Sequence, residues 1–438
     1  MTLTLKDMTE EHDKNFLKDM CHFLKTYEWF FNFSNIDILQ ESEKWCPQWM
    51  EIFQTTPLES AKNFFQSPNG AHNTIPQLVR DFVQQRNRVV QDFEKRYIEV
   101  RQSEGEVRPR LKKGLSPKKE HEVVKFGAFI NTHISGDCDR IIDVGSGAGH
   151  LERYLLQVWN ASESKCELCC VEREPSQLSS ADKWANRTGI DCQKHVRSII
   201  AKLEKSTFEE IEKQVGSNKS RQALIGLHAC GDLTNTMLSW FVSSPDYFSK
   251  LSVISCCYHK MTTFPISGTL RNTLVEDVNS ALTSVFARRL GAQDPFSVWY
   301  QRSLAEQNEH AKCFGRRAIL QTLVGNKNMP GKLKKKTRHG IRNGGNISNE
   351  EFLAEVERTY EFDNQDQVMA ALGQKLEMNY DWLEVFSGFQ AFLQLPLEYL
   401  IMLDKLLYLR ESLPERNPKL VRIFDASISP RCLLLYCD

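Results

Sequence analysis

The chain has 438 residues, of which 41% are hydrophobic, so it is long enough for two or three domains with ordinary buried cores. Lysine plus arginine and aspartate plus glutamate both number 56, and this balance excludes a global charge field that would attract nucleic acid or a membrane surface. The 13 cysteines, an odd number, favour reduced thiols over a disulfide framework, and we expect a reducing compartment, the cytoplasm, the nucleus or both.

The first part of the chain is expected to be a helical N-terminal domain, residues 1–110. It begins without the basic and apolar regions of a signal peptide. Thr9 is a candidate helix cap. Apolar side chains recur at helical spacing in two segments, at Leu17, Met20, Cys21, Leu24 and Tyr27 and at Leu78, Phe82, Val89, Val90, Phe93 and Tyr97.

Six aromatic residues gather in this domain: Trp29, Phe30, Phe31, Phe33, Trp45 and Trp49. They could stack nucleobases, but such residues more often fill a small helical core, and we favour the core.

A core with a Rossmann-like sheet is expected over residues 111–265. Ser116 and Pro117 begin a helix, as cap and first helical residue. Residues 141–151 then read IIDVGSGAGHL, a buried strand that runs into a glycine-spaced turn and a helix. A dinucleotide fingerprint, GxGxxG, would require glycine where His150 stands, so the turn favours S-adenosylmethionine over NAD.

The segments after this turn continue the alternation of strands and helices. Residues 166–172, CELCCVE, predict a second strand ending in Glu172, an acid that can bind two ribose hydroxyls. The expected cofactor-binding residues are Asp143, Gly145, Ser146, Gly147, Gly149 and Glu172. The next expected elements are a helix over 179–187, a strand over 191–196, an amphipathic helix over 199–215 and strands over 223–227 and 251–255.

Two polar segments follow the last two of these strands: HACGDL at 228–233 and CCYHKM at 256–261. Ligands of open parallel sheets bind at the carboxyl ends of strands, so both segments should border the same crevice as the glycine turn.

A helical insertion is expected over residues 266–418, before two terminal strands within 419–438 that complete the sheet as a hairpin-like pair, at 420–424 and 432–436. Its most apolar stretch, 385–407, is interrupted by polar residues, so we expect no transmembrane helix. The basic loop 327–345 carries seven cations and could grip RNA phosphates, act as a nuclear targeting signal or be a solvated loop: Lys327, Lys332, Lys334, Lys335, Lys336, Arg338 and Arg342.

Six motifs together closely resemble the methyltransferase-like protein 25 family, some members of which are named ribosomal RNA adenine dimethylase domain-containing proteins: SPKKEHEV at 116–123, DVGSGAGHL at 143–151, GLHACGDL at 226–233, SCCYHKM at 255–261, LDKLLYLRE at 403–411 and SPRCLLLY at 429–436. The resemblance runs from about residue 110 to the end. It implies an α/β fold of the class I S-adenosylmethionine-dependent methyltransferases. The pairing of HxCG with CCYH also resembles certain tRNA ribose methyltransferases.

One departure concerns adenine methylation. Adenine N6 methylases place Asn or Asp, Pro and an aromatic residue at the end of the fourth strand. This chain has HACGD there, at 228–232, which does not support the adenine dimethylase name.

The expected catalytic residues are His228 and His259 as candidate bases, Asp232 as an orienting group and Tyr258 as a stacking or hydrogen-bonding partner. The alternative is that His228 and Asp232 contact the cofactor or cap a helix. Four residues before the first strand could reach the cofactor carboxylate or a phosphate, or form a solvated face: Lys118, Lys119, His121 and Glu122.

We expect no metal site. Cys230, Cys256, Cys257, His228 and His259 are residue types that bind zinc, but they lack CxxC or HxxxH spacing. Cys166 and Cys169 have that spacing inside an expected strand, where buried thiols explain them better.

The sequence therefore predicts an S-adenosylmethionine-dependent methyltransferase that acts on a macromolecule. RNA is the expected acceptor, protein the second and a small molecule the third. The alternative from another class is a catalytically silent, cofactor-binding interaction protein.

Overall fold

The computed structural model describes residues 5–66, 75–100, 115–162, 166–177, 196–201, 207–216, 221–274, 280–324, 347–360, 362 and 364–438. The chain divides into two compact units: unit 1 comprises 1–20, 91–292 and 398–438, and unit 2 comprises 21–90 and 293–397. It passes between the units four times, three times within the helices α1 (Leu5–Thr26), α5 (Gln77–Tyr97) and α17 (Trp382–Ser412) and once between residues 292 and 293. The four domain ranges expected from the sequence are consecutive stretches of chain, whereas these units are defined by contacts in space, so the four ranges stay a prediction.

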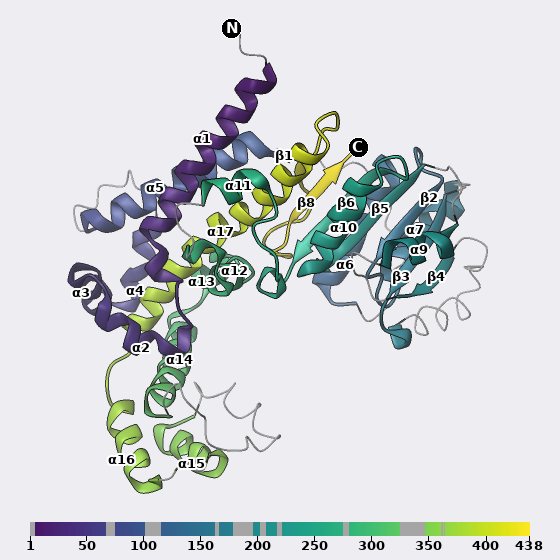
Figure 1. Cartoon of the computed structure of the whole chain (residues 1–438). Coiled ribbons are helices and arrows are strands. Elements are labelled where there is room, and N and C mark those ends of the chain that lie inside the picture. Colours follow the sequence, from purple (N-terminus) through teal and green to yellow (C-terminus); the bar gives the residue numbers. More distant parts are fainter. Residues whose placement is uncertain are drawn as a thin grey trace. The chain divides into compact units, whose positions relative to one another are not determined.

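Unit 1 is built on an eight-stranded sheet in the order β1-β7-β8-β6-β5-β2-β3-β4 (Figure 1). β8 is antiparallel to β6 and β7, whereas the other neighbouring pairs are parallel. The strands are β1 (Ile98–Val100), β2 (Arg140–Val144), β3 (Glu167–Glu172), β4 (Val196–Ile200), β5 (Gln222–Cys230), β6 (Phe248–Cys256), β7 (Lys419–Arg422) and β8 (Leu433–Cys437). The α/β class is confirmed, and so is the sheet completed by an antiparallel terminal pair.

The strand order reverses beside β2. From β2 the chain builds outward through β3 and β4, and it then returns to place β5 on the other side of β2. Ligands of such sheets bind at the carboxyl ends of the strands that flank this switch point. We therefore expect the functional site at the carboxyl ends of β2, β3, β5 and β6.

Helices of unit 1 cover this sheet. α6 (Pro117–His133) begins as expected, because Ser116 Oγ accepts a hydrogen bond from the Lys119 N–H at 3.2 Å. α6 packs against α7 (His150–Ser162), while α10 (Asp232–Ser243) packs on β5 and β6 (Figure 1). Further helices of unit 1 are α9 (Phe208–Val215), α11 (Gly268–Thr273) and α12 (Val285–Gly291).

Some local expectations are wrong. Ile199 and Ile200 belong to β4 and not to a helix over 199–215, whose described helical part is α9. The error has a physical cause: β4 is an edge strand with Ile199 buried and Ile200 exposed, so its apolar pair does not show the pattern of a buried strand. Thr9 lies inside α1 and is not its cap, and the short strand β1 was not expected.

Other expectations lie outside the described residues. These are the helix over 179–187, most of the strand over 191–196 and the basic loop 327–345.

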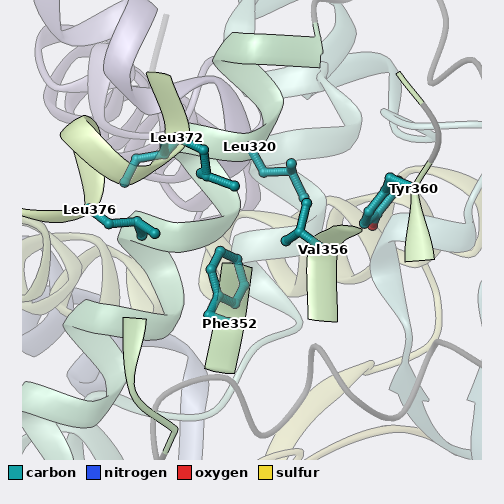
Figure 2. Packing of buried hydrophobic residues seen from close by; sticks show 7 residues of the cluster. Leu320, Phe352, Val356, Tyr360, Leu372 and Leu376 are labelled. Atoms are coloured by element: carbon teal, nitrogen blue, oxygen red, sulfur yellow. The ribbon is translucent and has the colours of Figure 1, made fainter. Parts of the chain in front are cut away.

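Unit 2 is helical. Its helices are α2 (Ile38–Glu41), α3 (Pro47–Thr55), α4 (Leu58–Ala61), α13 (Phe296–Gln301), α14 (Leu304–Val324), α15 (Asn349–Thr359) and α16 (Gln365–Leu376), together with parts of α1, α5 and α17. Figure 2 shows one of its apolar clusters, in which Phe352 and Val356 of α15 lie among Leu320 of α14 and Leu372 of α16. Burial of such side chains is the main force that stabilises a helical unit.

The aromatic cluster near the N-terminus belongs to unit 2. Five of the six rings are buried there, those of Phe30, Phe31, Phe33, Trp45 and Trp49, and Trp29 is half-buried. The Phe30 ring stacks on those of Phe386 and Phe389, with centroid separations of 5.5 and 5.7 Å. The core interpretation is therefore confirmed, and the rings offer little open surface for nucleobases.

Among the described residues, each helix is either too short or too polar to cross a bilayer.

Candidate functional site

The glycine turn after β2 has the backbone that the sequence requires. Gly145, Gly147 and Gly149 have φ angles of 75°, 60° and 72°, in the left-handed region where a Cβ is unfavourable. The N–H of Gly145 donates to the Val171 carbonyl at 2.8 Å, which ties the turn to β3. A Cβ added at Gly147 would meet only the Gly145 carbonyl oxygen, at 4.0 Å, so the turn borders open space. This is the shape of a cradle for a ligand.

Glu172, at the end of β3, reaches this turn. Its Oε2 accepts the N–H of Gly147 at 2.9 Å, and its Oε1 accepts those of Arg173 and Glu174 at 2.8 and 3.0 Å. A carboxylate has about four acceptor positions, so roughly one stays available, on Oε2. Together with the half-buried position of Glu172, this suits a hydroxyl donor such as a ribose.

Buried polar atoms lie beside the same turn. Asp143 is only 2% exposed and its Oδ1 has no hydrogen-bond partner among the described residues, and the same holds for Ser146 Oγ. Burial, followed by the charge of Glu152, raises the pKa of Asp143 well above its usual range. A cationic ligand group would favour the ionised carboxylate, and S-adenosylmethionine carries two such groups, an ammonium and a sulfonium. The residues present therefore fit this cofactor.

His228 stands at the end of β5 in a strained position. Its φ is 67°, at a register irregularity between β5 and β6. Its Nε2 lies 2.8 Å from Oε2 of Glu122 on α6, and Glu122 Oε1 accepts the hydroxyl of Ser429 at 2.8 Å. The backbone strain is thus accompanied by a fixed ring orientation.

The carboxylate of this pair is buried and ionised. Although burial opposes ionisation, the hydrogen bond and charge of His228, with help from Ser429 and Lys119, hold the pKa of Glu122 below its usual value. A carboxylate only accepts hydrogen bonds, so the proton of a neutral His228 sits on Nε2. The lone pair on Nδ1 is then available to accept a proton from a substrate.

Asp232 does not orient His228. Its two oxygens accept the N–H and hydroxyl of Thr262 at 2.9 and 2.7 Å, so it anchors the segment after β6 to the start of α10. The carboxylate that contacts the ring of His228 is that of Glu122 and not that of Asp232.

The other two expected catalytic residues lie after β6, in the short helix η7 (Tyr258–Lys260). Tyr258 is 1% exposed and donates its hydroxyl to Glu398 at 3.0 Å, while Arg431 pairs with Glu398 at 2.9 Å. This burial leaves the ring no open face for a substrate, so we assign Tyr258 to packing. His259 is half-buried, and burial followed by Arg289 and Lys260 lowers its pKa. It remains a second candidate base.

Sequence reasoning missed two features of this edge of the sheet. Glu122 was expected at the cofactor carboxylate, at a phosphate or on a solvated face, and its helical position alone gave no sign of a partner 106 residues away. Cys230, Cys256 and Cys257, which lack a metal-binding spacing, come together here in space.

A family model described as a methyltransferase domain matches residues 118–264. This range contains the glycine turn, Glu172, the pair of Glu122 with His228, and the segment after β6.

The probable methyltransferase-like protein 25 of Homo sapiens is 29% identical to this chain over 226 residues, which cover 48% of this chain and 35% of the human protein. The chain thus spans about a third of the length of this curated relative.

Two solved structures are also similar. One is a SAM-dependent methyltransferase from Aquifex aeolicus, with a TM-score of 0.23 and 14% identity over 32% of this chain and 68% of that one. The other is coclaurine N-methyltransferase bound to N-methylheliamine and SAH, with a TM-score of 0.28 and 9% identity over 89% of this chain and 96% of that one. At these scores neither structure carries an argument, and the fold assignment rests on the sheet itself and the family model. This chain therefore contains a class I methyltransferase domain, and the similarity to the methyltransferase-like protein 25 family that its motifs predict is confirmed.

Proposed function

We propose that this protein is an S-adenosylmethionine-dependent methyltransferase that methylates a hydroxyl group of RNA, most simply a ribose hydroxyl. The observation that carries the proposal is the buried Glu122 carboxylate, which holds Nε2 of His228 at the end of β5 and leaves Nδ1 without a partner among the described residues. The pairing of HxCG with CCYH, which resembles tRNA ribose methyltransferases, supports RNA as the acceptor.

The glycine turn is the proposed cofactor site. Glu172 would accept a ribose hydroxyl, Asp143 and Ser146 would face the amino-acid part, and the N-terminus of α7 would favour its carboxylate. When bound, S-adenosylmethionine supplies an electrophilic methyl group whose leaving thioether is neutral.

The proposed chemistry is a single displacement. Bound S-adenosylmethionine would give its methyl group to the acceptor oxygen and would be left as neutral S-adenosylhomocysteine, while Nδ1 of His228 would take the acceptor proton. Glu122 then stabilises the positive charge that develops on the imidazole. The chain's main contribution is position, because an in-line displacement depends on alignment.

The pair of Glu122 and His228 favours an oxygen atom over a nitrogen atom as the methyl acceptor. A neutral amine attacks with its own lone pair and loses its proton easily afterwards, whereas an alcohol is a weak nucleophile until a base takes its proton. A histidine oriented by a buried carboxylate is therefore more useful for a hydroxyl acceptor. The residues at 228–232 also lack the asparagine or aspartate, proline and aromatic residue of adenine N6 methylases.

Isotope-labelled methyl transfer tests the proposal. The purified full-length chain is incubated with labelled S-adenosylmethionine and either total RNA or cell-lysate protein, with the Gly147→Arg variant as the control for contaminating enzymes. We expect label in RNA only, in nucleotides whose 2′-O-methyl group makes the adjoining phosphodiester resist alkaline cleavage.

Each other outcome has a definite meaning. Label in methylated bases would keep RNA as the substrate but would contradict a hydroxyl acceptor. Label in protein would contradict RNA as the substrate and favour a protein methyltransferase. Cofactor binding without transfer to either pool would favour the silent interaction protein.

A further inference from the structure

A cluster of three thiols lies at the carboxyl ends of β5 and β6. Cys230 ends β5, Cys256 ends β6, and Cys257 follows it. Sγ of Cys230 is 3.1 Å from that of Cys256 and 3.6 Å from that of Cys257, and all three sulfurs lie within 4.8 Å of one another. Within the described ranges this is the one group of three or more metal-ligating side chains that meets so closely.

The fold itself brings these sulfurs together. Cys230 and Cys256 are direct partners in the parallel pairing of β5 with β6. Cys257 adopts a left-handed backbone, with φ at 51°, which turns the chain immediately after the strand. A non-glycine residue in this region is uncommon, and such strain often marks a functional position.

The residue after Cys230 is also fixed against the end of β6. The Gly231 N–H donates to the Cys256 carbonyl at 3.1 Å, and a Cβ at Gly231 would lie 2.9 Å from Cβ of Lys260. Glycine is therefore needed here for the two strand ends to come this close. Backbone contacts thus hold the two strand ends that carry the cluster together.

The spacing of the sulfurs matches one metal ion. A tetrahedral zinc ion with Zn–S bonds of about 2.3 Å places its ligand sulfurs about 3.8 Å apart. The observed separations of 3.1 and 3.6 Å come within a small side-chain adjustment of this value. Thiolate sulfur is also a preferred ligand of zinc.

We propose that Cys230, Cys256 and Cys257 bind a zinc ion through three thiolates, with the fourth coordination position open to solvent. Cys256 is buried, Cys257 half-buried and Cys230 exposed, so the cluster opens outward on the Cys230 side. Sites with three protein ligands typically keep water or another small ligand in the fourth position.

Binding is balanced by proton release. Each thiol gives its proton to solvent as its sulfur lone pair binds the ion, so one Zn²⁺ and three thiols yield a complex of charge −1 and three protons. The site would clamp the end of β5 to the end of β6, two residues beyond His228. It is distinct from the cofactor site and does not depend on the proposed function.

Metal analysis of the full-length protein tests this inference. Purified without chelators, or loaded with Zn²⁺ and desalted, the wild type should retain about one tightly bound zinc ion per chain. Cys256→Ser and Cys257→Ser should each lose most of it, while the matched control Cys46→Ser, which removes an exposed thiol of unit 2, should retain it.

A second measurement covers variants that fold poorly. The metal-depleted wild type, titrated with Co²⁺, should show sulfur-to-metal charge-transfer absorption and regain the unfolding temperature lost on depletion. The inference is overturned if the wild type retains no zinc and gives no thiolate absorption with Co²⁺. It is also overturned if Cys46→Ser loses zinc as fully as the cluster variants, or if Cys230 and Cys256 form a disulfide in the native protein.

Discussion

The Glu122→Gln variant tests the account of the base most sharply. Glutamine is nearly the same size as glutamate, its carbonyl can still accept the Nε2–H of His228, and its amide can donate to Ser429. The change therefore removes the negative charge and little else from a residue that is 2% exposed. The protein should fold, because both hydrogen bonds can be kept.

The expected magnitude follows from the charge. Hydrogen bonds to charged groups contribute about 1.5–3 kcal/mol, roughly twice the neutral ones, and this difference matters most when His228 becomes positive. The difference is then about 0.75–1.5 kcal/mol, and we expect kcat to fall about 4- to 13-fold, since each 1.36 kcal/mol is a factor of ten. The dissociation constant for S-adenosylmethionine should not change, because Glu122 is bonded to His228 and Ser429 and not to the glycine turn.

The assay is single-turnover methyl transfer with the RNA acceptor, with cofactor affinity measured by calorimetry. Glu167→Gln is the matched control, because it neutralises an exposed carboxylate that pairs with Arg140 on the surface of the sheet. Glu122→Asp, with a shorter charged side chain, should recover part of the lost rate. Unchanged kcat in Glu122→Gln, or equal losses in the Glu167 control, would refute the reasoning.

Three further predictions concern the cofactor site. Gly147→Arg should abolish S-adenosylmethionine binding, because φ is 60° and the side chain would enter the open space of the turn; an unchanged calorimetric affinity would contradict this. Glu172→Ala should weaken binding by about 1–3 kcal/mol, or roughly 5- to 150-fold, through lost charged hydrogen bonds; a neutral result would mean that the ribose lies elsewhere. Asp143→Asn should weaken cofactor binding and yet stabilise the free protein increasingly as pH rises. Burial and Glu152 raise the native pKa of Asp143, so above its unfolded pKa the native state binds more protons than the unfolded state, and wild-type stability falls with pH until the native pKa is passed. Urea unfolding at pH 5 and pH 8 measures the difference in free energy of unfolding between the variant and the wild type. The same difference at both pH values would contradict the raised pKa of Asp143.

The glycine turn and Glu172 could be predicted from the sequence because both depend on local patterns. Closely spaced glycines at 145, 147 and 149 indicate a tight turn from residue type alone, and the strand that ends in Glu172 is a short apolar run in the sequence. The antiparallel terminal pair could be predicted for the same reason. β4 could not, because an edge strand with one buried side chain does not carry a period of two.

The pair of Glu122 with His228 depends on packing between distant elements. Glu122 lies on a helix that precedes β2, whereas His228 lies near the end of β5, and only the folded unit brings them within 2.8 Å. The thiol cluster depends on register, since Cys230 and Cys256 meet only because β5 and β6 pair in parallel with their ends aligned. A sequence shows which residues have the right chemistry, but not which strand ends are neighbours.

The central claim is that S-adenosylmethionine binds in the glycine turn between β2 and α7. A crystal structure of the full-length chain soaked with S-adenosylhomocysteine tests it most directly. The account predicts ribose hydroxyls within hydrogen-bonding distance of Glu172 and the amino-acid part over Gly147. Density for the ligand at another place, or no ligand density at the turn at saturating concentration, would contradict it.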